Sequence, residues 1–534
     1  MTARHPDRRD VFRGAAAALA TGLALPGRAP AQGVGANRTL RFIPHADLSA
    51  IDPFATTGYV VRNHGYMVYD TLYSLDAEFR PRPQMAEGHE VTDDGKTYTI
   101  RLREGLRFHD GEPVRAADCV ASLRRWAARD GFGASLMAAT DELAAVDDRT
   151  LRFRLKAPFP LLLEAIGKPS SPVPFIMPER VAATPATTQI RETVGSGPFR
   201  FLRDEWNPGS RAAYARFEGY VPRNEPLDGA AGGKLVHFDR VEWITIPDPG
   251  TATAAIQRGE VDWYEQVQGD LLPVLRRSRD IEVTSFDPIG SVVLLRFNHL
   301  HPPFDDVRVR RAVLTAVNQA DYMGAMVGDP TVWRECKAFF PCGTPMSSGT
   351  GNGVMTANLD RARAMLRESG YAGQKVVVIS PTDLAYLHTL GLVTEDLLKR
   401  IGFNVELVAT DWGSVLTRRA NLGPPEQGGW SVFHTTAVGV EFMSPAAHLA
   451  LRGNGRAAWP GWPTNPTLET LRTEWMAATE VDARKAIAAR MEAEAFSAVP
   501  YAPLGQYGIP TALRRNLTGL HRASAPFVWG LRKT

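Results

Sequence analysis

The chain has 534 residues, more than one ordinary domain contains, so at least two hydrophobic cores are expected. Hydrophobic residues make up 44% and charged residues 22% of the sequence, proportions that exclude an intrinsically disordered chain. The 61 basic and 58 acidic residues nearly balance, which argues against a nucleic-acid-binding protein.

Residues 1–31 are predicted to be an export signal. An arginine pair precedes a short apolar run at 14–27, and small residues at 29–31 provide a signal-peptidase site. The pattern resembles a twin-arginine signal. An anchor helix is the alternative, but the run is short and Pro26 breaks it. No Cys lies near the cleavage point, so we expect a soluble periplasmic protein without a lipid anchor.

The N-terminal third combines hairpins and helices. Leu40–Ile43 is predicted to be the first strand, and the strict alternation over Thr97–Arg103 predicts another. The same pattern returns at Leu151–Leu155, and Pro113–Arg129 has the apolar spacing of a helix. This order indicates an α+β arrangement.

Farther along the chain, strands and helices alternate. Val241–Ile246 is predicted to be a strand, and Pro249–Arg258 a helix that ends at a glycine. Lys375–Ser380 is a Val-rich strand, a helix then runs to Ile401, and Val405–Val408 forms the next strand. Strand, helix and strand in this order predict a parallel β-α-β unit and a second α/β core. A last long helix is expected over 483–495.

The three cysteines suggest one disulfide. Cys336 and Cys342 are close enough in sequence to form one in an oxidising compartment, and a reduced buried pair is the alternative. Cys119 lies in a helical pattern and is expected to pack in the core.

The common catalytic motifs are absent from the sequence. It contains no Gly-x-Ser-x-Gly elbow, no His-Glu-x-x-His, no phosphate-binding loop and no dinucleotide fingerprint. We therefore expect a protein that is not an enzyme and that needs neither a cofactor nor a metal ion.

Aromatic residues gather in the second half of the chain. Trp412, Trp430, Phe433, Trp459 and Trp462 lie within about fifty residues, in stretches interrupted by Gly and Pro. Tryptophans in such loops can line a cleft and stack on a solute. Ordinary packing of loops on the second core is the alternative for each.

A series of motifs resembles the extracellular solute-binding proteins of family 5, the peptide/nickel group. The first is a run beginning Ala-Glu-Gly-His-Glu-Val-Thr-Asp-Asp-Gly-Lys and ending near Arg125. The others follow in the family's order, at 194–199, 255–262, 297–298, 303–312 and 482–484. Together they cover nearly the whole chain after the signal.

The resemblance implies a fold and a function. The fold is a two-lobed α/β clam of class II, with lobe one at 38–288 and lobe two at 289–498. Lobe one would carry an extra α+β subdomain at about 70–195, and 499–534 would return to it. The implied function is to capture a small organic solute by hinge closure in the periplasm. The closed form would deliver the solute, as a monomer, to an ABC permease driven by separate ATPase subunits.

The resemblance and the aromatic residues together suggest candidate ligand contacts. They are Tyr59 from lobe one and, from lobe two, Trp412, Trp430, His434, Thr435, Glu441, Trp459 and Trp462. Peptide-binding relatives share an Asp in the loop after the Trp-bearing strand. The stretch 430–442 lacks it and offers Glu441 as a substitute, which leaves the identity of the solute open. The alternative functions are binding of a metal chelate or haem on the same fold and, at lower rank, a secreted hydrolase.

Overall fold

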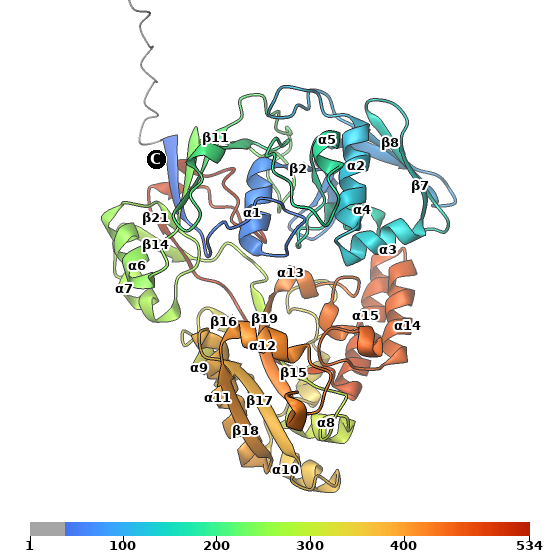
Figure 1. Cartoon of the computed structure of the whole chain (residues 1–534), viewed down its shortest axis with the longest axis vertical. Helices are drawn as coiled ribbons and strands as arrows, with labels where there is room; N and C mark the ends of the chain where they lie inside the picture. The colour runs from blue at the N-terminus through green and yellow to red at the C-terminus, as the bar shows by residue number, and fades with distance from the viewer. Residues whose placement is uncertain (1–37) are drawn as a thin grey trace, which may run out of the picture.

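The computed structural model describes residues 38–534, and the expected export signal at 1–31 lies outside the described residues. The chain forms an upper lobe, blue to green in Figure 1, and a lower lobe, yellow to orange. We call them lobe one and lobe two. The C-terminus lies in lobe one, where Nζ of Lys533 donates to the carbonyl oxygen of Thr39. Among residues 38–534, no helix has both the length and the apolar character that a membrane span requires.

Lobe one is built on a mixed seven-stranded sheet. β1 pairs parallel to both β12 and β13, and β21 from the C-terminal segment lies antiparallel between β13 and β14. The sheet order is β10 (Phe199–Phe201), β11 (Arg211–Arg216), β12 (Arg240–Ile244), β1 (Thr39–Ile43), β13 (Trp263–Tyr264), β21 (Thr511–Arg514) and β14 (Ile281–Thr284).

Helix α6 of lobe one (Pro249–Arg258) has the expected bounds. The side chain of Asp248 caps its first turn by accepting from the backbone N–H of Thr251 at 2.7 Å. Gly259 ends the helix with a φ of 74°, a conformation that costs glycine little.

A four-stranded antiparallel sheet forms the additional α+β part of lobe one. Its order is β5 (Ala86–Val91), β6 (Thr97–Leu102), β8 (Thr150–Leu155) and β7 (Thr140–Ala145). The side chains of Tyr98, Ile100 and Leu102 are buried, as the alternating pattern predicts. Helices α2 (Ala116–Ala127) and α3 (Gly131–Ala139) pack on this sheet, so the predicted helix at 113–129 is confirmed with slightly shorter bounds.

Lobe two contains a six-stranded mixed sheet. The order is β16 (Trp333–Arg334), β20 (Tyr501–Tyr507), β15 (Ser291–Phe297), β19 (Val432–Val438), β17 (Lys375–Pro381) and β18 (Asn404–Thr410). β17 and β18 are parallel and are joined by α11 (Ala385–Ile401), which confirms the predicted β-α-β unit. Gly402 ends α11 with a φ of 110°. Alternate residues of β17 belong to hydrophobic clusters on opposite faces, in agreement with its continuous apolar run.

The remaining regular elements are short or lie on the outside of the sheets. Lobe two ends in α14 (Pro466–Ala477) and α15 (Val481–Ala498), which is longer than the helix predicted at 483–495. The other lobe-two helices are α8 (Val307–Ala316), α9 (Gln319–Met326), α10 (Leu359–Glu368), α12 (Trp412–Arg419) and α13 (Gly439–Phe442). The other helices of lobe one are α1 (Tyr59–Val68), α4 (Leu162–Gly167), α5 (Glu179–Ala182) and α7 (Leu272–Arg276). Three short strand pairs complete the secondary structure: β2 (Asp70–Thr71) with β9 (Phe175–Ile176), β3 (Tyr73–Leu75) with β4 (Pro81–Pro83), and β22 (Leu517–Thr518) with β23 (Arg532–Lys533).

The chain passes between the two large sheets twice. The first crossing joins β14 to β15, and the second joins β20 to β21. The crossings touch at Gly290, where an added Cβ would lie 2.2 Å from the carbonyl oxygen of Tyr507. Gly290 also has a φ of 72°. A residue with a Cβ would therefore both clash with this carbonyl oxygen and be strained in its backbone conformation.

Contacts on several sides hold the lobes together. Arg484 of α15 donates to Glu164 of α4 at 2.8 Å, and the guanidinium of Arg276 in α7 pairs with Asp329 of lobe two. A third contact, from Tyr59 to Glu441, lies between the lobes and is described below. The two lobes therefore touch at three points besides the crossings.

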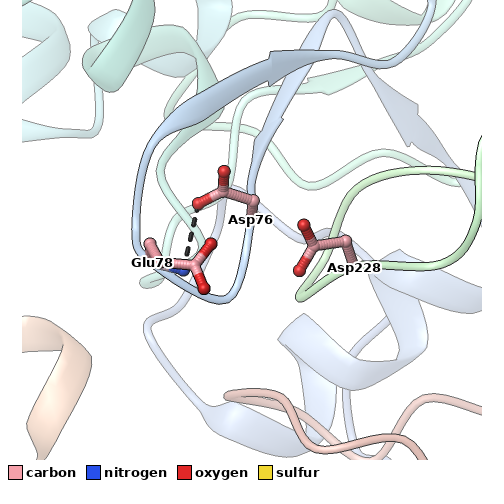
Figure 2. Close-up of side chains that lie close together, drawn as sticks. All are labelled: Asp76, Glu78 and Asp228. Atoms are coloured by element: carbon pink, nitrogen blue, oxygen red, sulfur yellow. Dashed lines mark hydrogen bonds between the residues drawn. The ribbon is translucent and has the colours of Figure 1, made fainter.

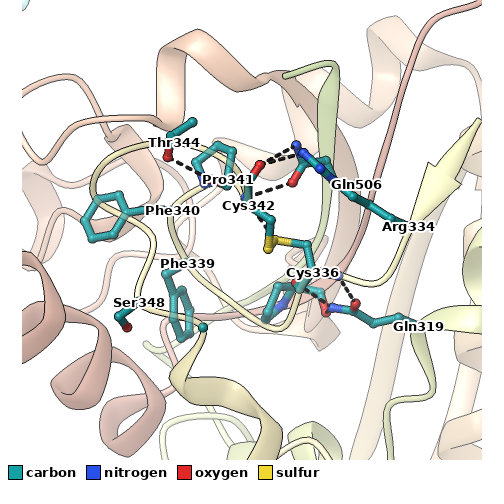
Figure 3. The surroundings of a disulfide bond; sticks show 12 residues. Gln319, Arg334, Cys336, Phe339, Phe340, Pro341, Cys342, Thr344, Ser348 and Gln506 are labelled. Carbon is teal, nitrogen blue, oxygen red and sulfur yellow. Dashed lines mark hydrogen bonds between the residues drawn. A yellow bond between two sulfur atoms is a disulfide. The ribbon is translucent and has the colours of Figure 1, made fainter. Parts of the chain in front are cut away.

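Cys336 and Cys342 of lobe two are joined by a disulfide (Figure 3). Backbone N–H groups of the two cysteines donate to the side-chain oxygens of Gln319 and Gln506, at 2.6 and 2.9 Å. The disulfide therefore fixes a loop that is already bonded to α9 and β20. Cys119 is buried in α2 as a thiol.

Candidate ligand-binding site between the lobes

Tyr59 and Glu441 meet between the lobes. Tyr59 is the first residue of α1 in lobe one, and Glu441 belongs to α13, the short helix that follows β19 in lobe two. The hydroxyl of Tyr59 donates to Oε2 of Glu441 at 3.1 Å, although 382 positions separate the residues in sequence. Both side chains remain partly exposed, so together they form a polar contact at the surface where the lobes face each other.

The protein surroundings change the acidity of both groups. Burial raises the pKa of Glu441, and the hydrogen bond from Tyr59 and the charge of Arg62 act in the opposite direction. Burial also raises the pKa of Tyr59, and the neighbouring charge of Glu441 adds to the effect. A carboxylate withdrawn from water in this way would be stabilised by a cation brought into contact with it.

Apolar residues from both lobes surround this contact. Ile289 of the first crossing packs with Val438 and Val440 of lobe two, and Tyr59 and Phe79 of lobe one pack against them. An apolar wall beside a polar contact is typical of sites for small organic molecules. We call Tyr59, Glu441 and these apolar residues the interlobe site.

Asp287 brings a second carboxylate to the first crossing. Its side chain is 8% exposed, and Oδ1 accepts the backbone N–H of Ile289 at 2.9 Å. Burial raises its pKa, whereas backbone hydrogen bonds and the charge of Arg62 lower it. Sequence analysis missed both Asp287 and Arg62 as site residues, because an Asp before Pro is typical of a turn and an Arg inside a helix is typical of a solvent-facing position.

The predicted tryptophans do come together, in lobe two. The aromatic cluster consists of Trp412, Trp430, Phe433, Trp459 and Trp462, and it packs between α12 and one face of β17 and β19. The ring centres of Trp430 and Phe433 are 4.9 Å apart, and those of Phe433 and Trp459 are 5.4 Å apart.

Members of the aromatic cluster differ in their exposure. Trp430 has no exposed surface, its indole N–H donates to the carbonyl oxygen of Arg419 at 3.0 Å, and Trp462 is 5% exposed. Trp412 and Trp459 keep partly exposed rings, beside the guanidinium of Arg419. In this conformation a solute could touch Trp412 and Trp459, whereas Trp430 and Trp462 support them from the core.

His434 and Thr435 lie side by side on β19, but their environments differ. His434 is 1% exposed, and its Nε2 lies 2.7 Å from Oγ1 of Thr394 in α11. Burial lowers the pKa of His434 to about 3, so the ring is neutral near pH 7. Thr435 is partly exposed. His434 therefore bonds to the helix layer of lobe two, and Thr435 is the one of the pair with surface that a solute could contact.

A group of three carboxylates in lobe one has the proximity of a metal site (Figure 2). Asp76 is buried, but its oxygens accept from the guanidinium groups of Arg80 and Arg82, each at 2.9 Å. They also accept backbone N–H groups of the same turn, and Asp228 accepts the N–H of the residue after Asp76. The oxygens of Asp76 and one oxygen of Asp228 are thus already hydrogen-bonded within the protein. The role of the cluster is to close the turn between β3 and β4.

Comparisons with known proteins agree with this geometry. The family model described as "Bacterial extracellular solute-binding proteins, family 5 Middle" matches residues 80–445. A probable peptide ABC transporter periplasmic-binding protein of Sinorhizobium fredii is 39% identical over 531 residues, which cover 98% of this chain and 99% of the relative. A glutathione-binding protein of Pectobacterium atrosepticum is 22% identical and covers 89% of each chain.

A solved structure shares the fold. The ABC transporter substrate-binding protein CtaP of Listeria monocytogenes superposes with a TM-score of 0.77, at 19% identity, over 93% of this chain and 99% of its own. The predicted α/β two-lobed fold is thereby confirmed. From the family match and the similarity along almost its whole length, the chain belongs to the bacterial extracellular solute-binding proteins of family 5 and is a periplasmic solute-binding component of an ABC importer.

Proposed function

We propose that the solute is a small organic molecule with a cationic group, of the size and kind of a short peptide, and that Glu441 holds the cation in the interlobe site. The observation that carries the proposal is the hydrogen bond from Tyr59 of lobe one to Glu441 of lobe two. A carboxylate at this place is reached by both lobes at once, so a cation bound to it would favour the closed form. The names of the relatives, which include a peptide and glutathione, support a peptide-like solute.

In this proposal, some of the other candidate residues contact the solute directly and the rest support those that do. Thr435, Trp412 and Trp459 offer partly exposed surface for contact with the solute. Trp430, Trp462 and His434 support that surface from within lobe two. A micromolar affinity corresponds to about 8 kcal/mol, which apolar contact and a few charge-assisted hydrogen bonds can supply.

The proposal extends to export and delivery. The chain would leave the cytoplasm by the twin-arginine route, remain without a lipid anchor and act as a monomer. Its closed form would dock on permease subunits, with ATPase subunits behind them, and it would release the solute chemically unchanged. Closure by contacts from both lobes supports this cycle, because docking partners can distinguish open from closed forms.

The test uses two pools of dipeptides and tripeptides, one with both termini free and one with acetylated N-termini. We expect the free pool to raise the melting temperature of the wild-type protein and the acetylated pool to fail. Glu441→Gln should weaken binding of the free pool about 10- to 100-fold, since charge-assisted hydrogen bonds contribute about 1.5–3 kcal/mol. Glu474→Gln is the control, because Glu474 is an exposed carboxylate of lobe two outside the interlobe site, paired with Arg490.

The pH dependence gives a second readout. Because the pKa of Glu441 is raised, binding of the free pool should weaken on acidification while the pH is still above 4.5, the ordinary value for a glutamate. Equal binding of the free and acetylated pools would contradict recognition of a cation. Wild-type affinity in Glu441→Gln would remove that residue from the site, and failure of every pool would reject the peptide class.

A further inference from the structure

Arg62 is a buried cation without an acidic partner. It lies in α1 and is 5% exposed, and no carboxylate oxygen of residues 38–534 is within ion-pairing distance of it. Its Nε and Nη2 reach Oδ1 of Asn63 at 3.3 and 3.2 Å, and Nη2 also donates to the carbonyl oxygen of Ser524 at 3.1 Å. Nη1 is buried and has no hydrogen-bond acceptor.

Comparison with a second buried arginine of lobe one shows what Arg62 lacks. Arg125 is 4% exposed, and its Nη1 and Nη2 donate to the two oxygens of Asp52 at 3.1 and 2.8 Å. A buried charge without a counter-charge is costly, and a buried donor without an acceptor adds to that cost. Arg62 therefore lacks a paired carboxylate and an acceptor for Nη1, whereas Arg125 has both.

The position of Arg62 connects this incomplete group to the interlobe site. Arg62 follows Tyr59 by one helical turn of α1, which places the two side chains on one face. The guanidinium carbon lies 5.1 Å from the ring centre of Tyr59, whose hydroxyl donates to Glu441. Its charge also acts on Glu441 of lobe two and on Asp287 of the first crossing. Arg62 thus borders the site on the side of lobe one.

We propose that Nη1 of Arg62 donates to a carboxylate oxygen of the bound solute, which is therefore a zwitterion with its cation at Glu441 and its carboxylate at Arg62. This inference rests on the proposed function and narrows it to amino-acid and short-peptide chemistry with a free carboxyl end. The incoming carboxylate supplies the hydrogen-bond acceptor that Nη1 of Arg62 lacks, and it brings a negative charge into direct contact with the guanidinium. Tyr59, which touches both charged residues, lies between the two ends of the solute.

The experiment adds a third pool of the same dipeptides and tripeptides with amidated C-termini. We expect the wild-type protein to bind the amidated pool about 10- to 100-fold more weakly than the free pool, which is the range of a charge-assisted hydrogen bond. Arg62→Met should bind the free pool as weakly as the amidated one. Arg62→Lys, which keeps the charge, should retain part of the preference.

Two controls separate a binding role from a structural one. Arg129→Met removes another lobe-one arginine whose side chain bonds to backbone carbonyls only, and it should keep the preference for free carboxyl ends. The melting temperature of ligand-free Arg62→Met should equal or exceed that of the wild type, because replacing an unpaired buried charge by an apolar side chain removes a cost. A clear fall would assign Arg62 to the scaffold and overturn the inference.

The outcomes also separate this inference from the proposed function. Equal affinity of the wild-type protein for free and amidated pools, together with rejection of the acetylated pool, would overturn the role of Arg62 and leave that of Glu441 intact. Rejection of the amidated pool with acceptance of the acetylated pool would overturn the role of Glu441 and leave that of Arg62 intact. No binding of any pool would overturn both.

Discussion

Two buried cations, Lys234 in lobe one and Arg296 in lobe two, are stabilised in different ways. In lobe one, Nζ of Lys234 lies 2.6 Å from Oδ1 of Asp70, and both side chains are fully buried. In lobe two, the equally buried guanidinium of Arg296 has no carboxylate in the described part of the chain. It donates instead to four backbone carbonyls, at distances of 2.7 to 3.1 Å.

The difference shows two uses of a buried cation. A charge pair such as Lys234 with Asp70 depends on one partner, and loss of either residue leaves the other uncompensated. Arg296 instead ties irregular segments to β15, because its acceptors are the carbonyl oxygens of Ala450, Trp459, Pro460 and Pro500. Arg296 thus fixes the loops that carry part of the aromatic cluster through hydrogen bonds to their backbone carbonyls rather than through an ion pair. Burial accordingly lowers the pKa of Arg296.

Breaking the pair in lobe one should have the largest effect. Lys234→Met leaves the carboxylate of Asp70 buried without its cation and should lower the free energy of unfolding by about 3–5 kcal/mol. Denaturant titration followed by circular dichroism measures the loss. The double variant Asp70→Asn with Lys234→Met should recover most of it, since no unpaired charge remains. A double variant as unstable as Lys234→Met would contradict the account.

Removing Arg296, the buried cation of lobe two described above, should lower the free energy of unfolding somewhat less. Arg296→Met leaves carbonyls without donors but leaves no uncompensated charge, so we expect a loss of about 2–3 kcal/mol. The same titration measures it. Arg296→Lys should restore part of the stability, because an ammonium group can donate to several of the carbonyls. Wild-type stability in Arg296→Met would show that the carbonyls find other donors.

The disulfide distinguishes the lobes further, since the one in the described residues lies in lobe two. Its sequence separation of 6 closes a short loop, and chain-entropy arguments give about 2 kcal/mol for such a loop. Replacing Cys336 and Cys342 by Ser together should cost about that amount and abolish any response of stability to reductant. Cys119→Ala, in lobe one, is the control and should keep the response. A double variant that still responds would contradict the assignment.

Acid sensitivity should be shared by the lobes and is the smallest effect. Burial lowers the pKa of His64 in lobe one and of His434 in lobe two to about 3, from 6.5. Their neutral forms stabilise the fold above pH 6.5, and this contribution is lost as the pH falls from 6.5 toward 3. Each adds a slope of at most about 1.4 kcal/mol per pH unit.

Single variants test whether the acid response is shared. His64→Gln and His434→Gln should each reduce the change in unfolding free energy between pH 6.5 and 5 by about 1.6 kcal/mol. Denaturant titrations at several pH values measure the slopes. Slopes unchanged in both variants would show that other groups cause the acid response.

Much of the secondary structure could be predicted, because caps and periodicity act within a few residues. The bounds of α6 follow from Asp248 and Gly259, and the burial of Tyr98, Ile100 and Leu102 follows from strict alternation. The candidate site was predicted less completely. Composition suggested that the tryptophans gather, but it could not distinguish the enclosed ring of Trp430 from the partly exposed ring of Trp459.

The sequence by itself determined the order of strands and helices, the β-α-β unit of lobe two and the family, since these depend on local spacing and on motifs along the chain. Only the tertiary structure decided which side chains meet. Tyr59 touches Glu441 across 382 positions, and Arg62 is left with an unoccupied donor beside them. Burial and partnership depend on packing between distant segments, and local periodicity carries no information about that packing.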